Sequence, residues 1–227
     1  MKNAIVYIDG YNLYYSRLKG SAFKWLDVVA LFRDHLLHAQ LPDAQVTRIR
    51  YFSAPALAKF ATHERDSVTA QNEYLRALKA RNPNLIEIQM GYHVVEHVPM
   101  IAYKEPPDKT ARVGVWRLEE KLTDVNIALA MYRDAAKGLV DIIVLCTNDS
   151  DMVPAIEAIQ ADFPAIQIGV IAPLPPPHGK IVRRANKELS KLANWSRHYI
   201  LDEELQKAQL PSVVPTRKKA ARKPTYW

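Results

Sequence analysis

The sequence predicts an α/β fold in which helices cover a central, mostly parallel sheet. Short apolar runs rich in β-branched residues recur along the chain, and segments with helical spacing of apolar residues separate them. The run DIIVLCT, residues 141–147, is apolar on both of its faces. That pattern is typical of a strand in the middle of a parallel sheet. Strands that alternate with helices indicate a sheet with helices packed on it.

The first half of the chain is predicted to contain three strands and three helices. Asp27 is a suitable N-cap for the second helix, and Asn82-Pro83 ends the third. The predicted strands are 2–8, 46–52 and 85–89, and the predicted helices are 12–18, 27–38 and 61–81.

The second half begins with a change of character. Residues 90–118 alternate between polar and β-branched side chains and are interrupted by Pro99 and Pro106-Pro107, which predicts a β-hairpin flap with its tip at 105–110. A helix over 119–137, with Gly138 at its C-cap, returns the chain to the sheet. The remaining predicted elements are strands at 141–147 and 165–172 and helices at 151–161 and 182–194.

Composition restricts the class of protein. The 227 residues are 48% hydrophobic and 24% charged, which is typical of a globular protein with a full core. Apolar runs fall short of the ~20 residues of a membrane helix, and the start MKNAIVYIDG lacks the features of a signal peptide. We therefore expect a cytoplasmic protein without membrane contact. The single cysteine, Cys146, rules out an internal disulfide and is expected to be buried.

Positive charge is concentrated at the end of the chain. Of the net charge of +7, five units come from residues 211–227, which contain no acid. We expect a domain over residues 1–205 and a basic tail over 206–227. Such a tail either binds a polyanion or serves only as a solubilising extension, and composition alone leaves both readings open.

Acidic side chains recur where the predicted strands end. Asp9 follows the first strand, and Asp149 and Asp151 follow the strand at 141–147. Glu120 and Asp124 are four residues apart near the start of the helix predicted at 119–137, which would place them on one helical face. Ligands of such sheets bind at the carboxyl ends of the strands. If the strands are neighbours, the acids converge there.

Converging carboxylates repel one another unless a cation neutralises them. Oxygen ligands without histidine or cysteine favour Mg²⁺ or Mn²⁺, which support displacement at phosphorus. Each acid also has an ordinary interpretation: Asp149 or Ser150 could cap the next helix, and Asp124 could be a surface residue. The joint placement favours the metal site.

Three stretches resemble the motifs of the NYN domain family, a branch of the PIN-like nuclease superfamily. They are VYIDGYNLYYS, EEKLTDVNIALAMYRDA and DIIVLCTNDSDMVPAIEAI, in the family's order and spacing, and the resemblance covers about residues 3–200. It implies a three-layer α/β/α PIN-like (Rossmann-like) fold and RNA cleavage with Mg²⁺ or Mn²⁺. By this resemblance the catalytic and metal-binding acids are Asp9, Asp124, Asp149 and Asp151. The supporting residues are Asn12, Glu120, Asn148 and Ser150.

One departure from the family pattern bears on the metal. Many members have a further acid beyond the helix aspartate, and here that position is Ala130. The resemblance is therefore compatible with one metal or two. The third motif reads NDSD where many relatives have GDSD, and Asn148 is consistent with one subset of the family.

RNA cleavage requires phosphate contacts and often base stacking. The candidates for these contacts are Tyr11, Arg112, Arg117 and Lys121. Two other functions stay open. Ala130 and the basic tail suggest a non-catalytic RNA-binding or regulatory module, and some similar sequences are named hydroxylases of N-heterocyclic compounds, of the hydroxypyridine monooxygenase type. A G-x-G-x-x-G loop, which would support a nicotinamide or flavin site, is absent from the sequence. The flap is also a candidate surface for a homodimer.

Overall fold

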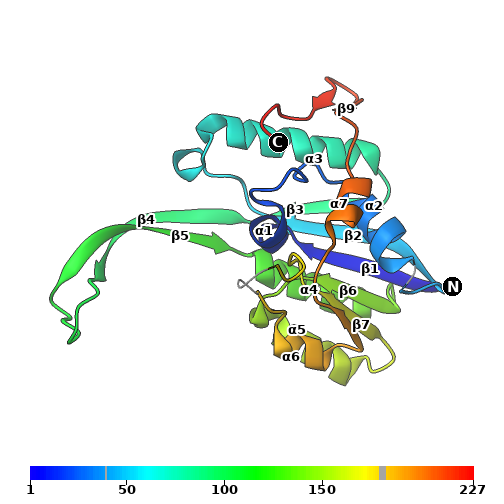
Figure 1. Ribbon diagram of the computed structural model, residues 1–227. Helices are drawn as coiled ribbons and strands as arrows, with labels where there is room; N and C mark the ends of the chain where they lie inside the picture. The colour runs from blue at the N-terminus through cyan, green and yellow to red at the C-terminus, as the bar shows by residue number, and fades with distance from the viewer. Residues whose placement is uncertain (39, 179–182) are drawn as a thin grey trace.

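A six-stranded parallel sheet forms the centre of the protein. The computed structural model describes residues 1–38, 40–178 and 183–227. The strands lie in the order β3-β2-β1-β6-β7-β8, and every neighbouring pair is parallel (Figure 1). Their bounds are β1 Lys2–Asp9, β2 Ala44–Ser53, β3 Ile86–Met90, β6 Ile142–Cys146, β7 Gln167–Ile171 and β8 Trp195–Arg197.

Helices cover both faces of this sheet. Along β1, Ala4, Val6 and Ile8 belong to one buried cluster, and Ile5 and Tyr7 belong to another, because successive side chains of a strand point to opposite faces. The first cluster includes residues of α1 (Gly10–Leu13), α2 (Val28–Ala30), the π-helical turn Leu31–Leu37, α3 (Glu64–Arg81) and α7 (Asp202–Lys207). The second includes residues of α4 (Thr123–Ala136), α5 (Val153–Asp162) and α6 (Lys187–Leu192). The predicted three-layer α/β/α fold is confirmed.

A buried polar contact ties α4 to the sheet. The Tyr7 hydroxyl donates a 2.7 Å hydrogen bond to Asp134, and Arg50 of β2 approaches both carboxylate oxygens of Asp134 at 2.8 Å. Burial raises the pKa of Tyr7 first, and the neighbouring Asp134 raises it further. The Asp134 carboxylate thus forms an ion pair with Arg50 and accepts a hydrogen bond from Tyr7 between layers that otherwise pack through apolar side chains.

The predicted flap is a long antiparallel hairpin that projects from the body (Figure 1). It consists of β4, Tyr92–Ile101, and β5, Arg112–Lys121. The prediction of one helix over 119–137 is wrong at its start, because residues 119–121 continue the strand. The turn into α4 follows at Leu122, which has a left-handed backbone with φ of 73°. Glu120 therefore lies at the end of a strand and not one helical turn before Asp124.

Other helices are shorter than predicted. The long helix of the first half begins at Glu64 after a 3₁₀ turn, Ala58–Phe60. A second 3₁₀ turn, Ser150–Met152, precedes α5. The predicted helix 182–194 is α6, Lys187–Leu192; residues 183–186 are irregular, and residue 182 lies outside the described residues.

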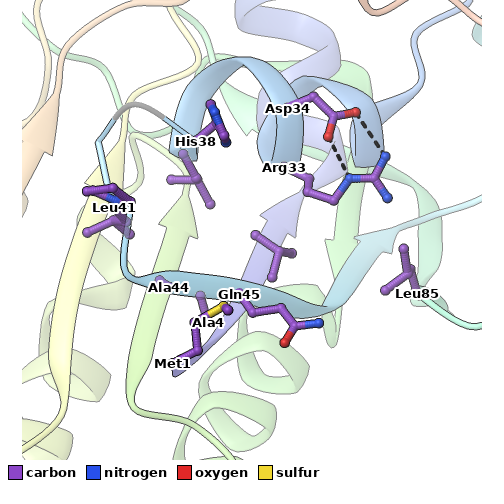
Figure 2. Close-up of a pocket in the computed structure, with 12 residues that line it drawn as sticks. Met1, Ala4, Arg33, Asp34, His38, Leu41, Ala44, Gln45 and Leu85 are labelled. Atoms are coloured by element: carbon purple, nitrogen blue, oxygen red, sulfur yellow. Dashed lines mark hydrogen bonds and ion pairs between the residues drawn. The ribbon is translucent and has the colours of Figure 1, made fainter.

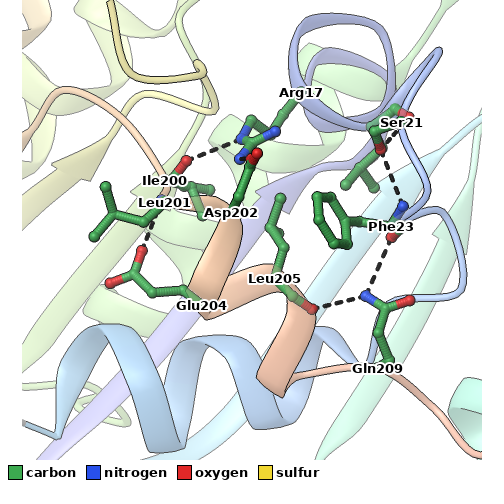
Figure 3. A network of polar contacts seen from close by, with 10 residues as sticks. Arg17, Ser21, Phe23, Ile200, Leu201, Asp202, Glu204, Leu205 and Gln209 are labelled. Carbon is green, nitrogen blue, oxygen red and sulfur yellow. Dashed lines mark hydrogen bonds and ion pairs between the residues drawn. The ribbon is translucent and has the colours of Figure 1, made fainter.

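The end of the chain packs against the body. Strands β9, Val213–Val214, and β10, Ala221–Arg222, contact α3. The Trp227 ring lies 6.1 Å from that of Trp25 and 5.9 Å from that of Tyr74 between ring centroids. Figure 3 shows a polar network beside α7 in which Arg17, 7% exposed, donates to the carbonyl of Ile200 and pairs with Asp202. Among the described residues no helix is long and apolar enough to span a membrane.

Candidate functional site at the carboxyl ends of β1 and β6

The two strands predicted to carry the acids are neighbours. Ile8 of β1 pairs with Cys146 of β6, so Asp9 and Thr147 are the next residues on each strand. The Thr147 hydroxyl donates a 3.1 Å hydrogen bond to Asp9 Oδ2 and accepts one of 3.2 Å from the backbone N–H of Asp149. Thr147 is fully buried and Asp9 is 5% exposed. One buried hydroxyl therefore links the first acid to the turn that carries the other two.

Asp9 is held by the turn that follows β1. Its Oδ1 accepts a 2.8 Å hydrogen bond from the backbone N–H of Asn12 and caps α1. A Cβ at Gly10 would lie 2.6 Å from the Phe52 carbonyl oxygen, so only glycine lets this turn pack against β2. Asn12 Oδ1 is buried and has no hydrogen-bond partner among the described residues. The Asp-Gly-x-Asn sequence thus buries a carboxylate and leaves an unpartnered amide oxygen in the same turn.

Burial also changes the charge of Asp9. Desolvation raises the pKa of this carboxyl from 3.8 to about 6, with smaller increases from Asp124 and Glu120. The hydrogen bonds from Asn12 and Thr147 act in the opposite direction. Asp9 is thus the most deeply buried member of a group of acids that act on one another.

Asp149 and Asp151 lie on the turn after β6. Asp149 Oδ1 accepts a 3.0 Å hydrogen bond from the backbone N–H of Asp151 and caps the 3₁₀ turn, which begins at the exposed Ser150. Asn148 accepts a 2.7 Å hydrogen bond from the N–H of Asn186 and thereby attaches the loop before α6. Asp149 has the capping role that its sequence also allowed, yet it remains close enough to Asp124 to raise the pKa of that residue.

Asp124 enters from the first turn of α4. Its pKa is raised first by burial and then by Asp149, Glu120 and Asp151. Glu120 reaches the site from the end of β5, where it accepts a hydrogen bond of 2.5 Å from the Thr123 hydroxyl. The structure therefore brings together all five acids from three separate segments of the chain, with Glu120 arriving from a strand instead of a helix.

The donor chemistry of this group fits a hard divalent cation. Its side chains offer carboxylate oxygens and the unpartnered Asn12 Oδ1, and a cation would offset the burial and the repulsion that raise the pKa values of Asp9 and Asp124. Within residues 1–38, 40–178 and 183–227, no group of three or more His, Cys, Asp or Glu side chains is placed so that it could hold a metal ion. Ala130 packs against the buried cluster under α4, away from any ligand role.

The candidate RNA contacts are divided between the two faces of the hairpin. Tyr11 is 38% exposed, and its ring centroid lies 6.0 Å from that of His93 on β4. Arg112 stands opposite Ile101 near the tip of the hairpin. Arg117 and Lys121 both pair with Glu119. Burial and Tyr15 raise the pKa of Tyr11, and Glu120 contributes to the same increase, so the Tyr11 hydroxyl lies near one of the acids.

A cavity elsewhere is separate from this site. A cavity of about 360 Å³ is lined by Met1, by Ala4 of β1 and Ala44 of β2, and by Arg33 and Asp34. Figure 2 shows the side chains around it. Ala4 and Ala44 lie near the amino ends of their strands, at the opposite edge of the sheet from Asp9. None of the predicted site residues lines this cavity.

Thr147 was missed in the sequence analysis. Its position in the sequence could have indicated the role, because Thr147 is the polar residue that ends the apolar run before Asp149, just as Asp9 ends the apolar run of β1. The position of Glu120 was predicted on a helix because its spacing from Asp124 fits one. Alternation of exposed and half-buried side chains continues to Lys121 and could have placed it on a strand.

Together, the parallel sheet with helices on both faces and the acids at its carboxyl edge define an α/β protein of the PIN-like type. The chain belongs to the NYN domain family, whose model matches residues 3–188. This match confirms the family resemblance of the three motifs.

Two known proteins are similar to the chain over most of its length. One, from Pseudomonas putida, is named 6-hydroxy-3-succinoylpyridine 3-monooxygenase HspA; it is 38% identical, and the match covers 98% of this chain and 74% of that protein. The other is a crystal structure of a protein of unknown function from Vibrio parahaemolyticus. It is 16% identical with a TM-score of 0.49, and the match covers 89% of this chain and 94% of that one.

Proposed function

We propose that the chain is a metal-dependent ribonuclease that hydrolyses RNA phosphodiester bonds in the cytoplasm. The observation that carries the proposal is the group of acids at the ends of β1, β5 and β6 and the start of α4, where burial and mutual repulsion raise the pKa values of Asp9 and Asp124. Titratable groups whose pKa values are shifted by burial together with neighbouring charges cluster at functional sites. Membership of a family related to nucleases supports the reaction class.

The residues that would hold Mg²⁺ or Mn²⁺ are Asp9, Asp124, Asp149 and Asp151. When bound, such a cation supplies charge neutralisation at phosphorus and lowers the pKa of a coordinated water. The remaining work falls to the chain itself. Thr147 fixes Asp9 relative to the 149–151 turn through its two hydrogen bonds. The Asn12 N–H and the glycine turn hold Asp9 at the strand end.

A specific observation favours a second candidate. The relative from Pseudomonas putida, 38% identical, is named a monooxygenase of a hydroxylated pyridine. If this chain shared that reaction, it would require a reductant and dioxygen and would act on an N-heterocycle. The acidic centre would then bind a metal or orient the ring instead of cleaving RNA. A non-catalytic RNA-binding module is the third possibility.

One set of assays separates these functions. Purified protein is incubated with 5′-labelled single-stranded RNA and Mn²⁺, and separately with 6-hydroxy-3-succinoylpyridine and NADH in air. The ribonuclease proposal expects RNA cleavage that EDTA stops and that Asp149→Asn reduces at least about 100-fold, the order of effect of removing one preorganised charged group. Glu157→Gln changes an exposed acid of α5 outside the site and is the matched control.

The outcomes are distinct. Pyridine-dependent NADH oxidation without RNA cleavage would reject the ribonuclease proposal and support the monooxygenase. Salt-dependent RNA binding without turnover in Mn²⁺ or Mg²⁺ would support the non-catalytic RNA-binding module. RNA cleavage that is equal in Asp149→Asn and wild type would reject the assignment of the acids.

A further inference from the structure

One face of the hairpin continues from the acidic site. In an antiparallel pair, residues directly opposite each other project from the same face of the ribbon. His93 is opposite Glu120, and the same face continues outward through the pair His97 and Trp116. We call this surface the Trp116 face. It also carries the pairs Val95–Leu118, Pro99–Gly114 and Ile101–Arg112.

Aromatic rings gather at the middle of the Trp116 face. Trp116 is 51% exposed, and its ring centroid lies 5.7 Å from that of His97 and 5.9 Å from that of Phe60. A Cβ at Gly114 would lie 2.5 Å from His97 Nε2, so the absence of a side chain there lets the imidazole lie across the strand. The result is an exposed group of rings to which the 3₁₀ turn Ala58–Phe60 contributes Phe60.

A cation accompanies these rings. Lys59 Nζ lies 3.6 Å from the centroid of the Trp116 ring and 5.6 Å from that of Phe60. Among the described residues Lys59 forms no ion pair with an acid. Lys59 lies over one face of the indole as a cation–π partner, and because no acid of the described residues neutralises it there, it can also contact a phosphate of a ligand that packs on the exposed part of the ring.

The opposite face of the hairpin differs in its charges. There Arg117 pairs with Glu96 and Glu119, and Lys121 also pairs with Glu119. These basic groups are neutralised within the protein, although their sequence suggests phosphate contacts. Exposed rings with an unpaired cation are the features that bind single-stranded nucleic acid, because every base offers a face for stacking and every nucleotide a phosphate.

We propose that the Trp116 face is a base-stacking platform for single-stranded RNA. A base stacks on Trp116, Lys59 contacts an adjacent phosphate, and the strand runs along the hairpin past His93 and Tyr11 toward Asp9. The choice of RNA as ligand rests on the proposed function. The platform itself follows from the rings, the cation and the continuity of this face with the acids.

The test measures binding without cleavage. The full chain in EDTA is titrated into a fluorescein-labelled 12-nucleotide oligouridine and followed by fluorescence anisotropy. Trp116→Leu is expected to weaken binding about tenfold or more, whereas Trp116→Phe retains a ring and stays within about threefold of wild type. Met100→Ala is the matched control, because Met100 is 52% exposed on the opposite face of the same hairpin. Its affinity is expected to be that of wild type.

Failure of the platform and failure of the ribonuclease proposal give different results. Binding that depends on Trp116 in a protein that never cleaves RNA would keep the platform and remove the nuclease. RNA cleavage by wild type, combined with equal oligouridine affinity in Trp116→Leu and wild type, would keep the ribonuclease proposal and reject the platform. Absence of measurable binding by wild type, or an equal loss in Met100→Ala, overturns the platform. So does a wild-type dimer that Trp116→Leu converts to a monomer in size-exclusion chromatography, because a second copy would then cover this face.

Discussion

The Thr147 hydroxyl bridges two neighbouring strands by donating to the Asp9 carboxylate at 3.1 Å while accepting from the Asp149 backbone at 3.2 Å. It is fully buried and contributes no charge. The pairing of β1 with β6 brings the ends of the two strands together, and this hydroxyl links Asp9 to the turn that begins at Asp149. The acidic site thus depends on a residue that offers no metal-ligating carboxylate of its own.

The first prediction concerns this hydroxyl. Thr147→Val keeps the shape of the side chain and removes both hydrogen bonds, so Asp9 loses a donor that lowers its pKa and the 149–151 turn loses its anchor. RNA cleavage should fall about 10- to 100-fold, since small displacements of catalytic groups have effects of this size. The free energy of unfolding in urea should fall by about 1–2 kcal/mol.

Thr147→Ser is the control, because it retains the hydroxyl and loses a methyl group. It should preserve most of the activity. If Thr147→Val cleaves RNA as fast as wild type, the hydroxyl does not position the acids.

A second prediction follows from the pKa of Asp9, which burial raises from 3.8 to about 6. Between these two pH values the unfolded chain has released the proton while the folded chain retains it. Stability therefore falls as pH rises through this window and is constant above it. A shift of about two pKa units corresponds to about 3 kcal/mol of destabilisation at neutral pH.

Asp9→Asn removes this cost. In EDTA at pH 7.5 it should unfold at higher urea concentration than wild type, and the difference should shrink toward pH 4. Chemical denaturation at several pH values measures it. A variant that is less stable than wild type at pH 7.5 would show that the hydrogen bonds of the Asp9 carboxylate outweigh its burial.

Binding of the divalent cation is the third prediction. A ligand at about 100 times its Kd stabilises the folded state by about 2.7 kcal/mol, which for a chain of this size raises Tm by roughly 5–10 °C. Mn²⁺ should raise the Tm of wild type by this amount, and Asp124→Asn should lose most of the increase. Asp124 lies near the other acids, since Asp149, Glu120 and Asp151 add to the increase in its pKa that burial causes. Differential scanning fluorimetry with and without EDTA gives the measurement.

Glu157→Gln should respond to Mn²⁺ as wild type does, since Glu157 is an exposed residue of α5. An equal Mn²⁺ shift in Asp124→Asn and wild type would place the cation elsewhere.

Local patterns were sufficient to predict the sheet and the strand-end acids. The apolar run before Asp149 reads as a central strand because both of its faces are buried, and the same holds for the run before Asp9. Whether Asp9 and Asp149 lie close together depends also on the order of the strands in the sheet, which no local pattern contains. The structure shows that β1 and β6 are parallel neighbours, so the two strand ends are adjacent.

Other features depend on contacts between distant segments. The start of α4 was predicted too early because Glu120 and Asp124 have helical spacing, whereas the pairing of β5 with β4 continues to Lys121. The group around Trp116 needs Lys59 and Phe60, more than fifty residues earlier in the chain. Such pairs have no spacing that a sequence pattern could reveal.

The last prediction compares two Arg–Asp pairs that differ in burial. Asp134 has a side chain 4% exposed and lies between Arg50 and the Tyr7 hydroxyl, whereas Asp34 pairs with Arg33 on the surface with both side chains 45% exposed (Figure 2). Asp134→Ala leaves the buried Tyr7 hydroxyl without its acceptor and Arg50 with only its ion pair to Glu87, and it should cost about 3 kcal/mol of unfolding free energy. Asp34→Ala removes an exposed pair and should cost about 0–1 kcal/mol. Urea denaturation of both variants tests the difference, which should persist in EDTA because neither aspartate belongs to the acidic site. Equal losses in the two variants would mean that the contact between α4 and β2 contributes no more than a surface ion pair.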